Sequence, residues 1–156
     1  MRVELKRREA FCPISASKQW TLRGLLSTFY FQGLADVAFA FEKLIVYQKA
    51  IAFADAACAT TEAFPRGYGF LADQLNRASV SIAANIAEGN GRFTVADRRN
   101  FFGIARGSVQ ECVSLLEITH RRSLMSSERY TTLRDDLEEI AKMLSGLITG
   151  LENRKA

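Results

Sequence analysis

Apolar residues recur every three or four positions from Phe41 to the C-terminus of this 156-residue chain. That spacing matches the 3.6-residue turn of an α-helix, so the apolar side chains gather on one face of each helix. The chain shows no sustained alternation with the period of two that is typical of a half-buried β-strand. The period therefore predicts an all-α domain over residues 41–156.

Turn signals divide this region into four expected helices, at residues 41–62, 69–88, 94–121 and 127–151. Each of these helices is long enough to span the length of a small domain. Because the connections between them are short, consecutive helices are expected to pack as antiparallel neighbours. The sequence thus predicts an up-down-up-down four-helix bundle.

The expected helix ends rest on capping and helix-breaking residues. Pro65 and Gly67 disfavour continuation of the first helix. The segment 89–91, Gly-Asn-Gly, is expected to end the second helix in the left-handed conformation of a C-cap. Thr94 and Asp97 form a near capping box at the start of the third helix, and residue 126 or 127, both serines, is expected to cap the fourth.

The first and third helices carry more apolar side chains than one core-facing stripe needs. The first is expected to bury Leu44, Tyr47, Ile51, Ala54 and Cys58, with Val46 and Phe53 outside that stripe. The third is expected to bury Phe101, Ile104, Ala105, Ser108, Cys112, Leu115 and Leu116, with Phe102, Val109 and Val113 as a second strip. Surplus apolar strips indicate a subunit interface, so a homo-oligomer is expected.

Residues 1–40 differ from the rest because they contain Pro13 and show no sustained period. They hold six Lys/Arg against three acidic residues, a net charge of +3, whereas residues 41–156 hold 15 against 14, a net charge of +1. Their basic start is not followed by the apolar segment of a signal peptide. This segment is expected to be a poorly ordered N-terminal extension or the product of an upstream start codon.

Several classes of function are disfavoured by what the sequence lacks. The three cysteines are widely spaced and accompany only one histidine, so neither a zinc site nor a disulfide framework is expected. There is no nucleophile–base pair, and no run of about 18 apolar residues that could span a membrane. We therefore expect a non-enzymatic cytoplasmic protein without a metal or other cofactor.

Two groups of polar residues are interpreted as helix-end features. His120 lies at the end of the third helix beside Arg121 and Arg122, where cations interact favourably with the helix dipole. The acidic run at residues 135–139 is expected to form a solvated face near the start of the fourth helix.

Polar residues are most concentrated from Gln74 to Glu111, within otherwise apolar helices. Polar groups at a close helix contact must be hydrogen-bonded, so a structural polar network is predicted at Asn85, Glu88, Ser108 and Glu111. The arginines that follow can instead form a patch that contacts phosphates, made of Arg92, Arg98, Arg99 and Arg106. Both interpretations remain open at this stage.

Residues 75–89, which end in Asn85-Ile86-Ala87-Glu88-Gly89, are followed by Gly91-Arg92. Together they resemble the signature of the four-helix bundle proteins encoded in intervening sequences of bacterial 23S ribosomal RNA genes. The opening at residues 41–50 is similar to the usual opening of that family, and the likeness extends to about residue 151.

The resemblance implies a left-handed antiparallel bundle that assembles as a homopentamer, without an established activity. It also implies that RNA or DNA is a candidate partner. A related bundle is similar to accessory proteins of diversity-generating retroelements, which bind a reverse transcriptase. The first hypothesis is therefore an oligomeric scaffold that binds nucleic acid weakly through the four arginines. The alternative is a protein–protein adaptor or accessory scaffold that binds no nucleic acid directly.

Overall fold

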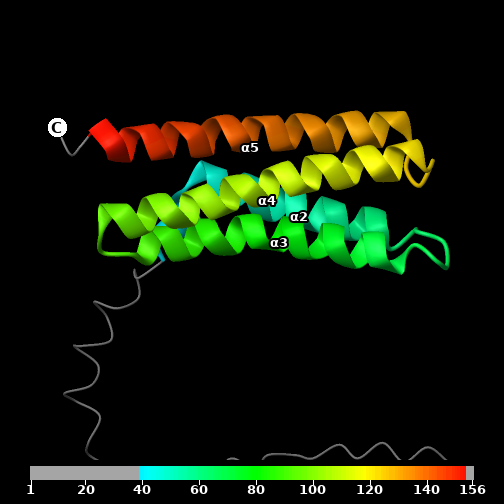
Figure 1. Ribbon diagram of the computed structural model, residues 1–156, viewed down its shortest axis with the longest axis horizontal. Helices are drawn as coiled ribbons and strands as arrows, with labels where there is room; N and C mark the ends of the chain where they lie inside the picture. The colour runs from blue at the N-terminus through cyan, green and yellow to red at the C-terminus, as the bar shows by residue number, and fades with distance from the viewer. Residues whose placement is uncertain (1–38, 154–156) are drawn as a thin grey trace, which may run out of the picture. The chain divides into compact units, whose positions relative to one another are not determined.

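The computed structural model describes residues 39–153, all of whose regular elements are helical. The predicted extension therefore lies almost entirely outside the described residues. A short 3-10 helix, η1 (Ala40–Lys43), precedes four α-helices, shown in Figure 1. These are α2 (Ile45–Thr61), α3 (Gly69–Gly91), α4 (Val95–Arg121) and α5 (Ser127–Asn153). The predicted all-α class and the four helices are confirmed.

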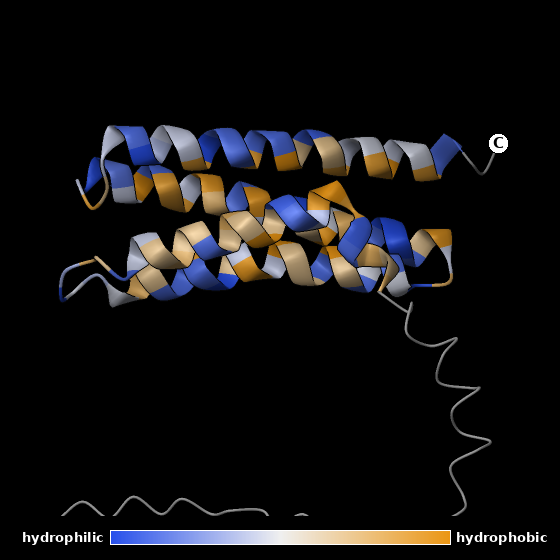
Figure 2. Cartoon of the chain, turned by 180° about the vertical axis from the view of Figure 1, so that it is seen from behind, coloured by the Kyte–Doolittle hydropathy of each residue, from blue (hydrophilic) through white to orange (hydrophobic). Residues whose placement is uncertain are grey.

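Each α-helix packs against two others, so that a core runs between all four. The packed pairs are α2 with α3, α3 with α4, α4 with α5, and α2 with α5. Phe53, Leu75, Leu116 and Leu137, one from each helix, are at most 1% exposed. Figure 2 shows the same arrangement from behind, with the hydrophobic side of α5 turned toward the other helices.

The apolar stripe of α3 is buried at each of its positions, Leu71, Leu75, Ala78, Ile82 and Ile86. The predicted stripe of α2 holds at Ala54 but is wrong elsewhere. Val46 and Phe53, expected outside the stripe, are 4% and 1% exposed, whereas Ile51 is 46% exposed. The apolar residues of α2 surround nearly the whole helix, so their spacing alone does not fix which side faces the core. The small side chains of Ala50 and Ala57 share the buried face and allow the neighbouring helices to approach.

The predicted stripe of α4 is confirmed at Ala105, Ser108, Cys112, Leu115 and Leu116, but it is wrong near the start of the helix. Phe102 and Val109, expected in a second strip, lie in the core at 4% and 3% exposed. Ile104 is 45% exposed and Phe101 only partly buried. The strips predicted as surplus are therefore largely core, and the apolar surface that remains includes Ile51 of α2 and Ile104 of α4.

The connections follow the capping signals with one exception. Asp97 donates its backbone N–H to Thr94 Oγ1 at 3.0 Å, and Arg129 donates its backbone N–H to Ser126 Oγ at 3.1 Å, so both hydroxyl caps are confirmed. Gly67 has a φ of +99°, which favours glycine in that turn. The predicted left-handed C-cap at residues 89–91 is wrong, because α3 continues in right-handed geometry through Gly91.

Candidate nucleic-acid interface

Arg92 and Arg98 stabilise the three-residue connection between α3 and α4. The Arg98 guanidinium donates from Nε to the Arg92 carbonyl oxygen at 2.7 Å. The Arg92 guanidinium pairs with Glu88 one turn earlier and lies 4.5 Å from the centre of the Phe101 ring. Both arginines therefore have contacts within the protein that hold this connection against the start of α4.

Arg99 and Arg106 lie on the side of α4 that faces α5. Arg99 Nη1 is 3.3 Å from Glu152 Oε1, and both side chains are more than half exposed. Arg106 is exposed and makes no hydrogen bond or ion pair within residues 39–153. An exposed ion pair of this kind contributes about 0–1 kcal/mol, so Arg99 is held only weakly.

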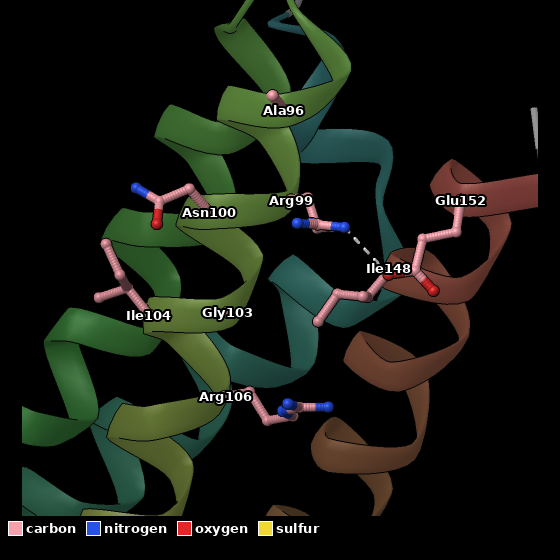
Figure 3. Close-up of a pocket in the computed structure, with 8 residues that line it drawn as sticks. All are labelled: Ala96, Arg99, Asn100, Gly103, Ile104, Arg106, Ile148 and Glu152. Atoms are coloured by element: carbon pink, nitrogen blue, oxygen red, sulfur yellow. Dashed lines mark hydrogen bonds and ion pairs between the residues drawn. The ribbon is translucent and has the colours of Figure 1, made fainter. Parts of the chain in front are cut away.

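These two arginines border a surface hollow of about 460 Å³ between α4 and α5. In Figure 3 their side chains extend toward α5, on either side of Ile148, and Glu152 lies near Arg99. Asn100 and Ile104 point to the other side of α4, with Gly103 between the two groups. The hollow is lined by Ala96, Arg99, Asn100, Gly103, Ile104, Arg106, Ile148 and Glu152.

The structure thus divides the four sequence-predicted arginines into two pairs. Arg92 and Arg98 are engaged at the α3–α4 connection, where Arg98 is partly buried. Arg99 and Arg106 are exposed beside α5. Only the second pair presents guanidinium groups that a ligand could engage without breaking the connection.

An oriented chain of hydrogen bonds joins α3 to α4. Asn85 Nδ2 donates to the Ser81 carbonyl oxygen at 2.7 Å and to Ser81 Oγ at 3.0 Å. The hydroxyls of Ser81 and Ser108 are 2.9 Å apart, and Ser108 donates to the Ile104 carbonyl oxygen at 3.2 Å. Because the Ser108 proton is used there, Ser81 donates to Ser108. Asn85 and Ser108 therefore belong to one polar contact, which is built around Ser81.

The other two predicted network residues lie outside this chain. Glu88 is exposed and pairs with Arg92 of the connection, not with a residue of α4. Glu111 is exposed and accepts a hydrogen bond from Gln74, which in turn accepts one from Arg77. Both carboxylates thus pair at the surface, where water also solvates them.

The family model for the 23S rRNA-intervening sequence protein matches residues 42–146. This chain belongs to that family. The match confirms the resemblance seen in the sequence, and it runs from within η1 through most of α5. No curated protein matches the chain.

A solved protein structure is similar to most of this bundle. It is a protein of unknown function from the S23 ribosomal protein family of Bacteroides thetaiotaomicron, 27% identical, with a TM-score of 0.63. The similarity covers 67% of this chain and 98% of that protein. In the present family member, Ile148 and Glu152 of the hollow lie beyond the segment that the family model matches.

Sequence reasoning missed the contact that Arg129 makes between α5 and α2. Arg129 Nη2 donates to the Ala56 carbonyl oxygen at 2.7 Å, and its Nε donates to Thr60 Oγ1 at 2.9 Å. The one signal in the sequence is a cation in the first turn of a helix, where the helix dipole favours acids. Such a residue needs a compensating partner, and here the partly buried carbonyl of Ala56 in α2 supplies it.

A second missed cluster surrounds Glu117, where α4 meets the start of α5. Arg121 Nε and Tyr130 Oη each donate to the Glu117 carboxylate at 2.7 Å. These bonds, with Arg121 the stronger cause, hold the pKa of Glu117 below its ordinary value. The His120 ring stacks on Tyr130 with 4.5 Å between ring centres. The interpretation of His120 as a helix-end cation therefore omitted its packing role.

The chemistry available within residues 39–153 is limited. These residues contain no group of three His, Cys, Asp or Glu side chains arranged to hold a metal ion. Burial raises the pKa of the Cys112 thiol to about 12, so that thiol stays protonated and unreactive at neutral pH. None of the described helices is both long and apolar enough to cross a membrane.

Proposed function

We propose that this protein is a non-enzymatic, self-associating helical bundle of the cytoplasm that binds RNA weakly through Arg99 and Arg106. The observation that carries the proposal is the pair of exposed guanidinium groups beside α5, one held only by a weak ion pair and one without a partner in the described chain. Guanidinium groups in this state can engage phosphates at little cost to the fold. The family description, 23S rRNA-intervening sequence protein, supports RNA as the candidate polymer.

The charge of the bundle explains why the binding is weak. Residues 39–153 carry 13 Lys/Arg and 14 Asp/Glu, a net charge of −1. A duplex or long strand is therefore attracted only locally, at the two arginines, and not by the whole molecule. Because each neutralised phosphate of a single strand contributes about −0.7 to the log–log salt slope, two contacts predict about −1.4 per protomer.

The proposed assembly is an antiparallel, left-handed, up-down-up-down bundle that forms a homopentamer. The short connections and the contacts of each helix with its neighbours support this topology. Exposed apolar side chains support self-association, among them Ile45 at 62% and Ile104 at 45% exposed. In a ring of copies the arginine pair is repeated by symmetry, which raises the avidity for a long strand. Light scattering on the full chain tests this, and a stable monomer contradicts it.

The direct test is binding of the full-length protein to a 20-nucleotide single-stranded RNA, followed by fluorescence anisotropy as salt is raised. The expected result is binding that weakens steadily with salt and is lost on substitution of Arg99 and Arg106 together by glutamine. Absence of binding at low salt, or binding insensitive to salt, contradicts the proposal.

An apolar groove between the start of α2 and residues 143–147 of α5 favours the alternative, an adaptor or accessory scaffold that recruits another protein. The groove has a volume of about 500 Å³ and is lined by Lys43, Leu44, Ile45, Val46, Met143, Gly146 and Leu147. Its exposed apolar walls suit a partner helix. A protein captured in stoichiometric amount from nuclease-treated lysate, lost with Ile45→Glu but retained with Arg106→Gln, favours the adaptor.

A further inference from the structure

Arg99 and Arg106 are placed so that both can reach one ligand group. They are seven residues apart, which is two helical turns or about 10.5 Å along α4, so both leave the helix on the same side. A group midway between them lies about 5 Å along the axis from each, within the reach of an arginine side chain. Figure 3 shows the two guanidinium groups extending toward α5 above and below Ile148.

The carboxylate of Glu152 lies beside Arg99, where the phosphate of a ligand would bind. The two groups are 3.3 Å apart, and their side chains are 57% and 51% exposed. Water competes for both groups, so the ion pair is easily exchanged for a stronger anion. A phosphate offers more negative charge and can accept two parallel hydrogen bonds from one guanidinium.

The rest of the hollow leaves space for such a ligand. Its volume of about 460 Å³ falls in the range of small-molecule sites. Gly103 stands on α4 between the turns that carry the two arginines, and nothing lies within 4 Å of the position that a Cβ would take there. Ile148 lies between the two arginine side chains and supplies apolar surface for the organic part of the ligand.

We propose that this hollow is a phosphate-binding site in which Arg99 and Arg106 clamp one phosphate group and Glu152 is the internal competitor that it displaces. The ligand is a phosphate ester, either the phosphodiester of an RNA strand or the phosphate of a free nucleotide. The RNA source rests on the proposed function, whereas the site itself does not.

The test is titration of the ¹⁵N-labelled full-length protein with inorganic phosphate and then with AMP, followed by NMR. Chemical-shift changes are expected at Gly103, at Arg106 and at the side chain of Arg99. Arg106→Gln is expected to weaken phosphate binding about tenfold or more, because one charge-assisted hydrogen-bonding group is lost. The matched control is Arg66→Gln, which removes the same charge from the exposed connection before α3 and leaves the affinity unchanged.

The substitution Glu152→Gln distinguishes phosphate binding in the hollow from general electrostatic attraction of phosphate to the protein. It removes the competitor from Arg99, so phosphate is expected to bind several-fold more tightly. The control Glu62→Gln removes the same negative charge at a position away from the hollow. It is expected to have little effect on the affinity for phosphate. An unchanged affinity in Arg106→Gln or in Glu152→Gln overturns the proposal, as do shift changes confined to another part of the bundle.

The source of the phosphate is resolved by comparing AMP with a short single-stranded RNA under the same conditions. Binding of both to the hollow, with RNA tighter per site, identifies the phosphodiester as the ligand. Binding of phosphate and AMP without RNA leaves the site standing and removes the RNA function. RNA binding that is unaffected by Arg106→Gln and Glu152→Gln removes the site, and it assigns RNA binding to another surface of the protein.

Discussion

Gly89 of α3 lies against the Phe102 ring of α4 so closely that a Cβ at position 89 would stand 2.8 Å from the ring. The same Cβ would be 3.0 Å from Phe101 Cβ. Glycine is therefore required here by the close approach of two helices and not by a turn. This contact brings the end of α3 to the start of α4 and so fixes the helix that carries the arginines.

Gly89→Ala is expected to lower the free energy of unfolding by about 1–3 kcal/mol, the usual cost of overpacking a core. Denaturant unfolding of the full chain measures it. Gly107→Ala is the matched control, because that helical glycine is exposed and has open space where a Cβ would stand. The control is expected to be stabilised by up to about 1 kcal/mol from helix propensity. Equal effects of the two substitutions would contradict the close-approach argument.

Ser108→Ala is expected to destabilise the bundle by about 1–3 kcal/mol, because it leaves the Ser81 hydroxyl without its acceptor at a closely packed contact. Ser114→Ala is the control, since Ser114 is exposed and bonds only the Gln110 carbonyl oxygen in its own helix. A loss of stability no larger than that of Ser114→Ala would show that the hydrogen bonds linking Asn85, Ser81 and Ser108 make no net contribution to stability.

Arg129→Ala is expected to cost about 1.5–3 kcal/mol, because it removes two charge-assisted hydrogen bonds to the end of α2. The effect is measured by thermal or denaturant unfolding. Arg134→Ala, an exposed arginine one turn later in α5, is expected to stay within about 0.5 kcal/mol of the wild type. If the two variants unfold alike, the link between α5 and α2 is not stabilising.

Glu117 gives the bundle a defined response to acid. Its folded-state pKa is lowered, so the unfolded chain binds its proton more readily and the stabilisation exists only while the carboxylate is ionised. The stability difference between the wild type and Glu117→Gln is expected to be constant above about pH 5. It should shrink as the pH falls through the lowered pKa. A difference that stays constant into strong acid argues against this origin.

The sequence predicted the four helices because their apolar periods are long and their caps are explicit, as at Thr94 and Ser126. The buried face of α3 was also predictable, since polar residues clearly mark its other side. The face of α2 and the first turns of α4 were not, because Phe53 and Ile51, or Phe102 and Ile104, are equally apolar and only packing decides between them. Packing also gives Gly89 a role that its neighbours in the sequence do not suggest.

The candidate site was predictable in composition but not in arrangement. The sequence groups Arg92 with Arg98, Arg99 and Arg106, whereas helix geometry sends the last two toward α5 and leaves the first two at the connection. Glu152 is 53 residues from Arg99 in the chain, and Arg129 is 73 residues from Ala56. No local pattern specifies such pairs, because they depend on how the helices pack.

The salt dependence of RNA binding by the wild type and by the variant with Arg99 and Arg106 both replaced by glutamine tests the central claim most directly. Anisotropy titrations with the 20-nucleotide single strand give the slope of log affinity against log salt for each protein. The account predicts a slope of about −1.4 per protomer for the wild type and loss of measurable binding for the double variant. Binding by the double variant with the same affinity and slope as the wild type would contradict it.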